Sequence, residues 1–202
     1  MTVSDHQHTD PLARLCSELP LPDALDAIEG QLPEAATIEA FIWDHQRRTA
    51  TGIRSGRPIA RADLDAATTG RDHVRALDLH GENLGLLVVE GPTVAPEVVD
   101  RLAGILALAV RASEPVSDTI AVRRRTRPMS LPAEMQWRVL PPSQFAGRGI
   151  RVSAAVEPAY ETGGDVFDYA VNGNRLFVAV LDARGHGLRA VSYTHLRAHE
   201  TF

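Results

Sequence analysis

Cysteine is nearly absent from this sequence of 202 residues, because Cys16 is the only one. A single cysteine excludes an intramolecular disulfide bond and a zinc site built from cysteines. We expect Cys16 to be a small buried residue on a helix face. Lysine is missing altogether, and arginine supplies every permanently basic side chain. This usage, with abundant alanine and valine, indicates a GC-rich coding sequence and says little about chemistry.

Excess positive charge and long apolar runs are missing too. The formal net charge is −5 and the isoelectric point is near 5.9, which excludes a general affinity for nucleic acid or anionic membranes. No apolar run reaches the ~18 residues that a membrane-spanning helix needs. The polar residues 1–10 lack the order of a signal peptide and are expected to form a disordered tail. We therefore expect a cytoplasmic protein that has neither nucleic acid nor membrane as a partner.

Residues 11–113 have the pattern of a small α+β domain. Apolar residues make up 44% of the chain, which is enough to build a core. Helical periodicity and the cap residue Asp23 predict helices, while alternation predicts strands. The expected helices cover residues 11–19, with Leu12, Leu15 and Leu19 at helical spacing, 24–32 and 96–113, with a further short helix near 62–67. The expected strands cover 37–44, 73–79 and 84–90, and a polar turn is expected at 45–52.

The order of these elements, together with the phrase GENLGLLVVE at residues 81–90, resembles a GAF-type sensory domain. The resemblance implies a module that binds a small ligand or joins two copies of the chain into a homodimer. No cluster of polar residues converging on a pocket can be recognised in the sequence. A domain that binds nothing and only dimerises therefore remains open as the alternative.

Residues 114–130 are predicted to be a linker between two domains. They contain the basic run Arg123–Arg127, bracketed by Pro115 and Pro128. A run of this length in an acidic protein favours a solvated face or linker, and nucleic-acid binding is the weaker alternative.

A further helix is predicted to begin after Ser130, whose hydroxyl can cap free amide groups. Met135 and Val139 are expected near one face of this helix, and residues 151–156 are expected to form a strand.

A β-hairpin near the end of the chain carries the strongest chemical signal. Residues 166–171 and 176–181 are rich in β-branched and aromatic side chains and flank Asn172–Asn174, whose residue types tolerate positive φ. If Gly173 and Asn174 form a two-residue loop, Asp165 lies opposite Asp182 with Cβ atoms about 5 Å apart. Two anions this close repel each other unless a cation lies between them. The pair therefore predicts a site for a hard divalent metal, Mg²⁺ or Mn²⁺.

Three phrases around this hairpin resemble a known family. They are SLPAEMQWRVLPP at 130–142, EPAYETGGDVFDY at 157–169 and LDARGHGLRA at 181–190. They resemble the first third of the SpoIIE/RsbU-type PPM phosphatases, bacterial serine/threonine phosphatases related to protein phosphatase 2C. The resemblance implies an α-β-β-α sandwich with two Mg²⁺ or Mn²⁺ ions at one end. It also implies a phosphorylated protein as substrate, commonly an anti-sigma-factor antagonist in a partner-switching pathway.

The resemblance assigns Asp165 and Asp182 as metal-ligating carboxylates and the backbone carbonyl of Ala183 as a further ligand. It implies in-line attack on phosphorus by a water activated between two metal ions, without a covalent enzyme intermediate. His186 has two open readings, either as an aid to proton transfer or as a structural turn residue.

The other polar residues near the pair have weaker roles. Glu157 and Glu161 are expected to be solvated loop carboxylates, with hydrogen bonds to metal-bound waters as the alternative. Asp168 lies on the opposite face of its strand and is expected to be structural. Gly163–Gly164 either lets the backbone approach the metals closely or forms an ordinary bulge.

The family pattern ends early in this sequence. Residues 131–191 cover only the first part of such a catalytic domain, while further metal-binding aspartates of the family lie in its C-terminal half. Residues 192–202 resemble translated adapter sequence and are expected to be non-native. For this reason the zinc site that the spacing of His195 and His199 would allow is rejected. We expect a metal-dependent phosphoprotein phosphatase that is inactive in this truncated form, with a non-catalytic regulatory or dimerisation module as the alternative.

Overall fold

A computed structural model describes residues 10–68, 73–92, 94–147, 149–161 and 163–182. These residues form six helices, an antiparallel five-stranded sheet and two hairpins, which confirms the expected α+β class. The chain divides into an N-terminal unit, Met1–Thr126, and a C-terminal unit, Arg127–Phe202. None of the helices in the described part of the chain combines the length and apolar character that crossing a bilayer requires.

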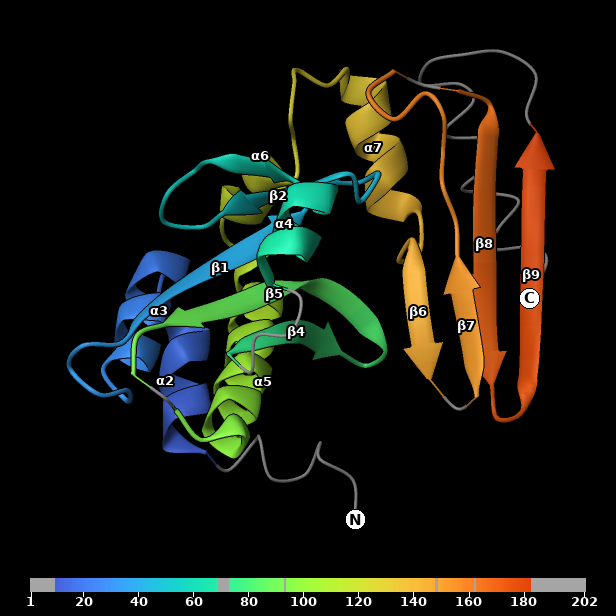
Figure 1. Ribbon diagram of the computed structural model, residues 1–202. Helices are drawn as coiled ribbons and strands as arrows, with labels where there is room; N and C mark the ends of the chain where they lie inside the picture. The colour runs from blue at the N-terminus through green and yellow to red at the C-terminus, as the bar shows by residue number, and fades with distance from the viewer. Residues whose placement is uncertain (1–9, 69–72, 93, 148, 162, 183–202) are drawn as a thin grey trace. The chain divides into compact units, whose positions relative to one another are not determined.

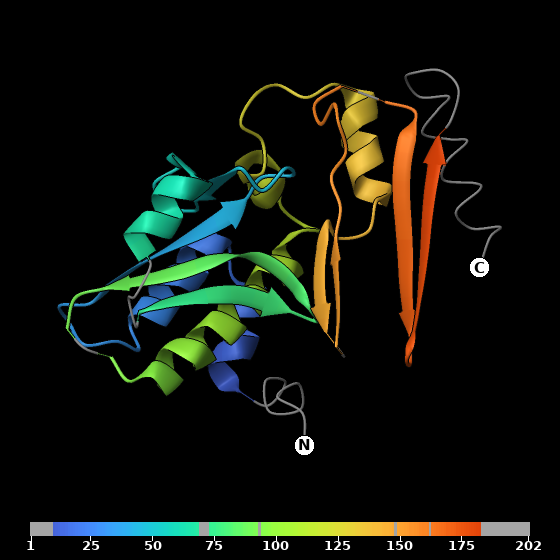
Figure 2. The ribbon, with the colours of Figure 1, turned by 45° about the vertical axis from the view of Figure 1, so that its right-hand side comes forward.

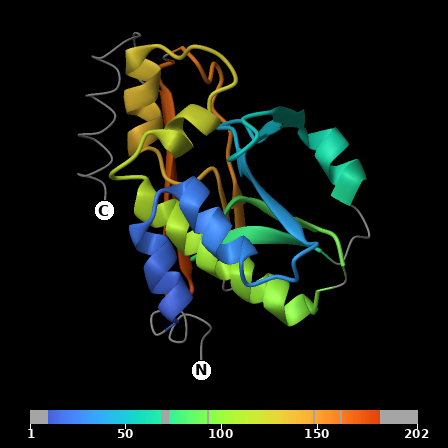
Figure 3. The same ribbon diagram turned by 90° about the vertical axis from the view of Figure 1, so that its left-hand side faces the viewer.

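The N-terminal unit is a sheet with helices on both faces, and the larger helical layer covers one of them (Figures 1 and 3). Its five strands are all antiparallel and lie in the order β3-β2-β1-β5-β4. In chain order the elements are α2 (Pro11–Glu18), α3 (Leu21–Glu29), β1 (Thr37–Trp43), β2 (Thr49–Gly52), β3 (Pro58–Ala60), α4 (Arg61–Thr68), β4 (Val74–Leu79), β5 (Glu82–Glu90), α5 (Pro96–Ser113) and α6 (Thr119–Arg123).

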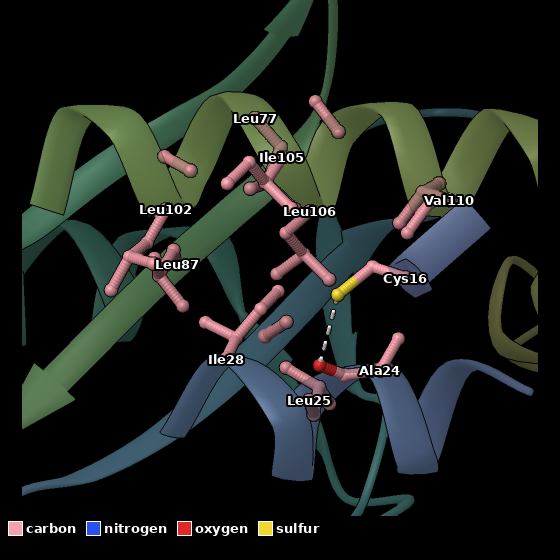
Figure 4. Packing of buried hydrophobic residues seen from close by; sticks show 14 of the residues in the cluster. Cys16, Ala24, Leu25, Ile28, Leu77, Leu87, Leu102, Ile105, Leu106 and Val110 are labelled. Atoms are coloured by element: carbon pink, nitrogen blue, oxygen red, sulfur yellow. Dashed lines mark hydrogen bonds between the residues drawn. The ribbon is translucent and has the colours of Figure 1, made fainter. Parts of the chain in front are cut away.

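The main core lies between the sheet and helices α2, α3 and α5, where alternate residues of β1 and the apolar stripe of α5 belong to one buried cluster. Figure 4 shows Leu102, Ile105 and Leu106 of α5 packed against the other helices and the sheet. Cys16 is fully buried in this cluster, as expected, and its Sγ donates a hydrogen bond to the carbonyl oxygen of Ala24 at 3.8 Å. Burial raises the pKa of the Cys16 thiol.

The opposite face of the sheet carries a smaller apolar cluster. It consists of Phe41 and Trp43 of β1, Ala50 of β2 and Leu64 of α4. The guanidinium groups of Arg47 and Arg61 lie 5.2 and 5.3 Å from the Trp43 ring, within the range of cation–π attraction. The indole Nε1 of Trp43 donates to Asn83 Oδ1 at 2.7 Å. The Trp43 ring thus contacts two guanidinium groups, and its indole N–H has a hydrogen-bond partner.

Several helix boundaries and faces differ from the sequence prediction. Helix α3 begins at Leu21, so Asp23 lies in its first turn rather than capping it. Asp10, assigned to the tail, caps α2 by accepting from the amide of Leu12, and it also pairs with Arg101. Leu15 is exposed, because α2 turns the face that contains Cys16 towards α5. The long helix α5 was predicted with its observed bounds.

Two strands of the N-terminal unit were not predicted at all. Residues 45–52 were expected to be a polar turn, yet Thr49–Gly52 pairs with β1 as β2. Pro58–Ala60 then pairs with β2 as the edge strand β3. A three-residue strand that starts with proline suits a sheet edge, because proline offers no amide to the ladder.

The segment expected to be a linker is partly folded onto the N-terminal unit. Helix α6 buries Ile120 and packs against β1 and β2. Arg123 donates to the carbonyl oxygen of Ile53 at 2.9 Å, and Arg124 pairs with Glu114 at 3.1 Å. The basic run is therefore not a wholly solvated face, since two of its guanidinium groups hold the chain to its own domain.

The described residues of the C-terminal unit form one helix and two hairpins (Figures 1 and 2). Helix α7 (Leu131–Val139) begins after Ser130, whose hydroxyl accepts from the amide of Ala133, as the sequence predicted. The strands are β6 (Gln144–Gly147), β7 (Ile150–Ser153), β8 (Asp165–Asn172) and β9 (Arg175–Asp182). Strand β6 was not predicted, and β7 is shorter than the expected strand at 151–156.

Replacement of Leu25 by alanine should destabilise the protein by about 2–5 kcal/mol, because Leu25 is 0% exposed and its loss leaves a cavity. Leu15→Ala is the matched control, since the same residue type on α2 is 48% exposed and should cost much less. Urea unfolding followed by circular dichroism measures both free energies. Equal losses for the two variants would contradict the helix orientations described above.

His45 should make the folded state sensitive to acid. Burial, and then the positive charges of Arg124 and Arg125, lower its pKa from 6.5 to about 4. Since the unfolded chain binds this proton at a higher pH, the contribution of neutral His45 to stability is lost as the pH falls from 6.5 towards 4. His45→Gln should therefore flatten the decline in unfolding free energy over this range. His80→Asn, which changes an exposed histidine, should leave the decline unchanged, and identical profiles for all three proteins would refute this assignment.

Candidate metal site

The β8–β9 hairpin has the register that the sequence predicted. Asn172 pairs with Arg175 across the two-residue loop Gly173–Asn174, and Asp165 pairs with Asp182 at the other end. Gly173 has a φ of +64°, which a glycine adopts without strain, and its place as the first loop residue suits a type II′ turn. The turn therefore aligns the two carboxylates eight residues away from it.

Asp165 and Asp182 point to the same face of the hairpin, because residues directly opposite in an antiparallel pair share a face. Both residues are exposed, so solvent can reach them. Asp168 lies on the other face, as expected, and its Oδ1 accepts from the amide of Tyr169 at 2.8 Å. The hairpin thus separates one local structural carboxylate from a pair that faces outward together.

The face that carries the pair is apolar along the rest of its length. Beyond the carboxylates, Phe167 pairs with Val180 and Tyr169 pairs with Val178. On the β8 side this face is covered, since Phe167 is only 9% exposed and the Tyr169 hydroxyl donates to the carbonyl oxygen of Pro142 at 2.9 Å. On the β9 side it is open, with Val178 61% and Val180 78% exposed.

Helix α7 holds the segment that leads into β8. The Trp137 Nε1 donates to the carbonyl oxygen of Ala159 at 2.7 Å, and the amide of Ser130 donates to that of Tyr160 at 3.1 Å. Gln136 Nε2 donates to the carbonyl oxygen of Asp165 itself at 2.8 Å. These contacts were missed because the helix was expected to use another face.

The orientation of α7 differs from the one that its apolar residues suggested. Met135 and Val139 were expected to lie on one packed face, but both are exposed. The buried residues are Ala133 and Gln136, one helical turn apart. A glutamine three residues after a small residue is a weak signal for a buried polar anchor, and larger apolar residues on the other face obscured it.

The structure assigns no metal role to Glu157, Glu161 or Gly163. Glu157 and Glu161 are exposed, in keeping with solvated loop carboxylates. A Cβ added at Gly163 would make only ordinary contacts, the nearest at 3.6 Å from Pro158 Cδ, so no close approach requires glycine there.

The described residues contain only part of the predicted ligand set. Ala183, His186, His195 and His199 lie outside the described residues. Within those described, no group of three or more histidine, cysteine, aspartate or glutamate side chains gathers in a way that could hold a metal. The donor set is thus two carboxylates, which suit a hard divalent cation that keeps several waters in its coordination shell.

Comparisons with known proteins add no relative. The chain matches no protein-family model, no curated protein and no solved structure. The site therefore consists of the hairpin itself. Its two outward-facing carboxylates are held in register by a tight turn, and the backbone of Asp165 is bonded to helix α7.

Proposed function

We propose that this chain carries the N-terminal part of a metal-dependent serine/threonine protein phosphatase of the PPM type. Its substrate is a phosphorylated protein, with an anti-sigma-factor antagonist of a bacterial partner-switching pathway as the leading candidate. The N-terminal unit acts as a GAF-like input domain. The pairing of Asp165 with Asp182 is the observation that carries this proposal.

The register supports the proposal because the turn residues predict it, and the family motifs separately assign the same two aspartates as metal ligands. Carboxylates paired across a hairpin repel each other, and a divalent cation relieves that repulsion. Oxygen donors select Mg²⁺ or Mn²⁺ over softer metals. When bound, two such ions activate water for attack on phosphorus and stabilise the charge of the transferring group.

The role of the chain itself is to hold and orient. Asp165 and Asp182 supply oxygen ligands from adjacent strand ends, and their exposure leaves room for water and substrate. The turn at Gly173–Asn174 fixes their alignment, and α7 fixes the backbone at Asp165. Two carboxylates are fewer ligands than two cations require, so the described residues supply part of the site.

The open apolar surface of β9 also supports a sandwich architecture. Val178 and Val180 lie on the same face as the carboxylates and are largely exposed. In a sandwich of two sheets, such a face packs against the second sheet and the polar residues at its end line the edge of the interface. The carboxylate pair stands at that end.

The GAF-like assignment draws support from the N-terminal unit. Its antiparallel sheet has helices α2, α3 and α5 on one face, and the smaller cluster around Trp43 lies on the other. A regulatory or dimerisation module without catalysis remains the rival function, and metal binding distinguishes the two.

Mn²⁺ binding should depend on both members of the pair and not on other carboxylates of the hairpin. Asp165→Asn and Asp182→Asn should each weaken Mn²⁺ affinity at least about tenfold, or about 1.4 kcal/mol, because each removes one charged ligand. Asp168→Asn is the matched control on the opposite face and should bind as the unaltered protein does. Electron paramagnetic resonance of free Mn²⁺ measures the three affinities. The proposal would be overturned if the chain binds no Mn²⁺, or if neither aspartate substitution changes its Mn²⁺ affinity.

Turnover should be absent even when Mn²⁺ is bound, because the described residues supply only part of a two-metal site. Phosphate release from a phosphoserine peptide, measured with and without Mn²⁺, tests this expectation. Metal-dependent release that Asp182→Asn abolishes would show instead that the chain completes an active site by itself.

A further inference from the structure

Gln136 of α7 is a buried polar residue in a small core. It is 2% exposed, and it is the only buried polar residue found among the described residues of the C-terminal unit. A buried amide costs free energy unless its hydrogen-bonding groups find partners. Its position therefore calls for a specific contact.

That contact is with the backbone of Asp165. Gln136 Nε2 donates to the carbonyl oxygen of Asp165 at 2.8 Å, a normal length for such a bond. Asp165 is the first residue of β8, where the ladder with β9 begins. Strand ends fray more readily than strand centres. A hydrogen bond from a packed helix at this residue holds the end of the strand in place.

The other contacts of α7 hold different residues. Trp137 Nε1 and the amide of Ser130 bind the carbonyl oxygens of Ala159 and Tyr160, five or more residues before Asp165. These bonds fasten the loop before β8 to the helix. Of the contacts described for α7, the one from Gln136 reaches the residue that carries the carboxylate.

We propose that Gln136 is a positioning residue that sets the backbone of Asp165 and so preorganises the carboxylate pair for a divalent cation. The metal role of Gln136 rests on the proposed function, whereas the hydrogen bond from Gln136 to Asp165 is present in the structure. Without the bond, the carbonyl of Asp165 loses its helix partner and the pair opposite Asp182 opens more often. Residues that orient metal ligands typically change metal affinity by about 10–100-fold when they are replaced.

The test compares two single substitutions on α7. Gln136→Met keeps the volume and removes the donor, whereas Trp137→Phe removes the donor to Ala159 and leaves Gln136 intact. Mn²⁺ affinity should fall about tenfold in Gln136→Met and stay within about twofold in Trp137→Phe. Without metal, amide hydrogen exchange measured by nuclear magnetic resonance should accelerate at Val166, which pairs with Leu181 in the ladder, only in Gln136→Met.

The outcomes separate this inference from the proposed function. If the unaltered chain binds Mn²⁺ and Gln136→Met binds it equally well, the positioning role is wrong and the metal site stands. If the two variants lose affinity and exchange protection equally, α7 acts only as a packed helix and the inference fails. If the unaltered chain binds no Mn²⁺, the proposed function fails, and with it the metal role of Gln136. Should Gln136→Met unfold by circular dichroism, Gln136→Asn, whose amide is one methylene shorter, takes its place.

Discussion

The length of one turn governs the chemistry of the C-terminal unit. With two loop residues, Gly173 and Asn174, every pair along β8 and β9 is fixed, and the last of these pairs is Asp165 with Asp182. Side chains alternate along a strand, so a slip of one residue would place one carboxylate on the opposite face from the other. A glycine that adopts positive φ without strain therefore determines, from the far end of the hairpin, whether the two carboxylates face the same side.

In this unit hydrogen bonds fix the orientation of helix α7, because the described apolar core is small. Its buried apolar residues are Ala133, Val156, Ala159, Tyr160, Val166 and Phe167. Apolar packing of this size restrains a helix only loosely, since it is not directional. Hydrogen bonds from Gln136 and Trp137 are directional, and they give α7 a defined rotation against the loop and strand that follow. In the N-terminal unit, by contrast, a large apolar core between the helices and the sheet fixes the helix orientations.

The parts of the fold that could be predicted were long and strongly patterned. Helix α5 shows its apolar stripe over five turns, and the hairpin combines two alternating runs with a turn signal. Strands β2, β3 and β6 have three or four residues, too few for alternation to show, and their pairing comes from neighbouring strands. The face of α7 was misjudged because both of its sides carry apolar residues and only tertiary contacts choose between them. The carboxylate pair was predictable because local turn chemistry fixed it, whereas the anchor at Gln136 depends on a contact across 29 residues.

Strand β9 pairs only with β8 within the described part of the chain. It is eight residues long, it contains neither lysine nor proline, and Val178 and Val180 are exposed on it. Strands with an unpaired edge of this kind are templates for pairing with another chain. Self-association of the protein in solution would then have two separable origins, the dimerisation proposed for the N-terminal unit and strand pairing at the open side of β9. A polar residue at Val178 would suppress the second origin and leave the first untouched.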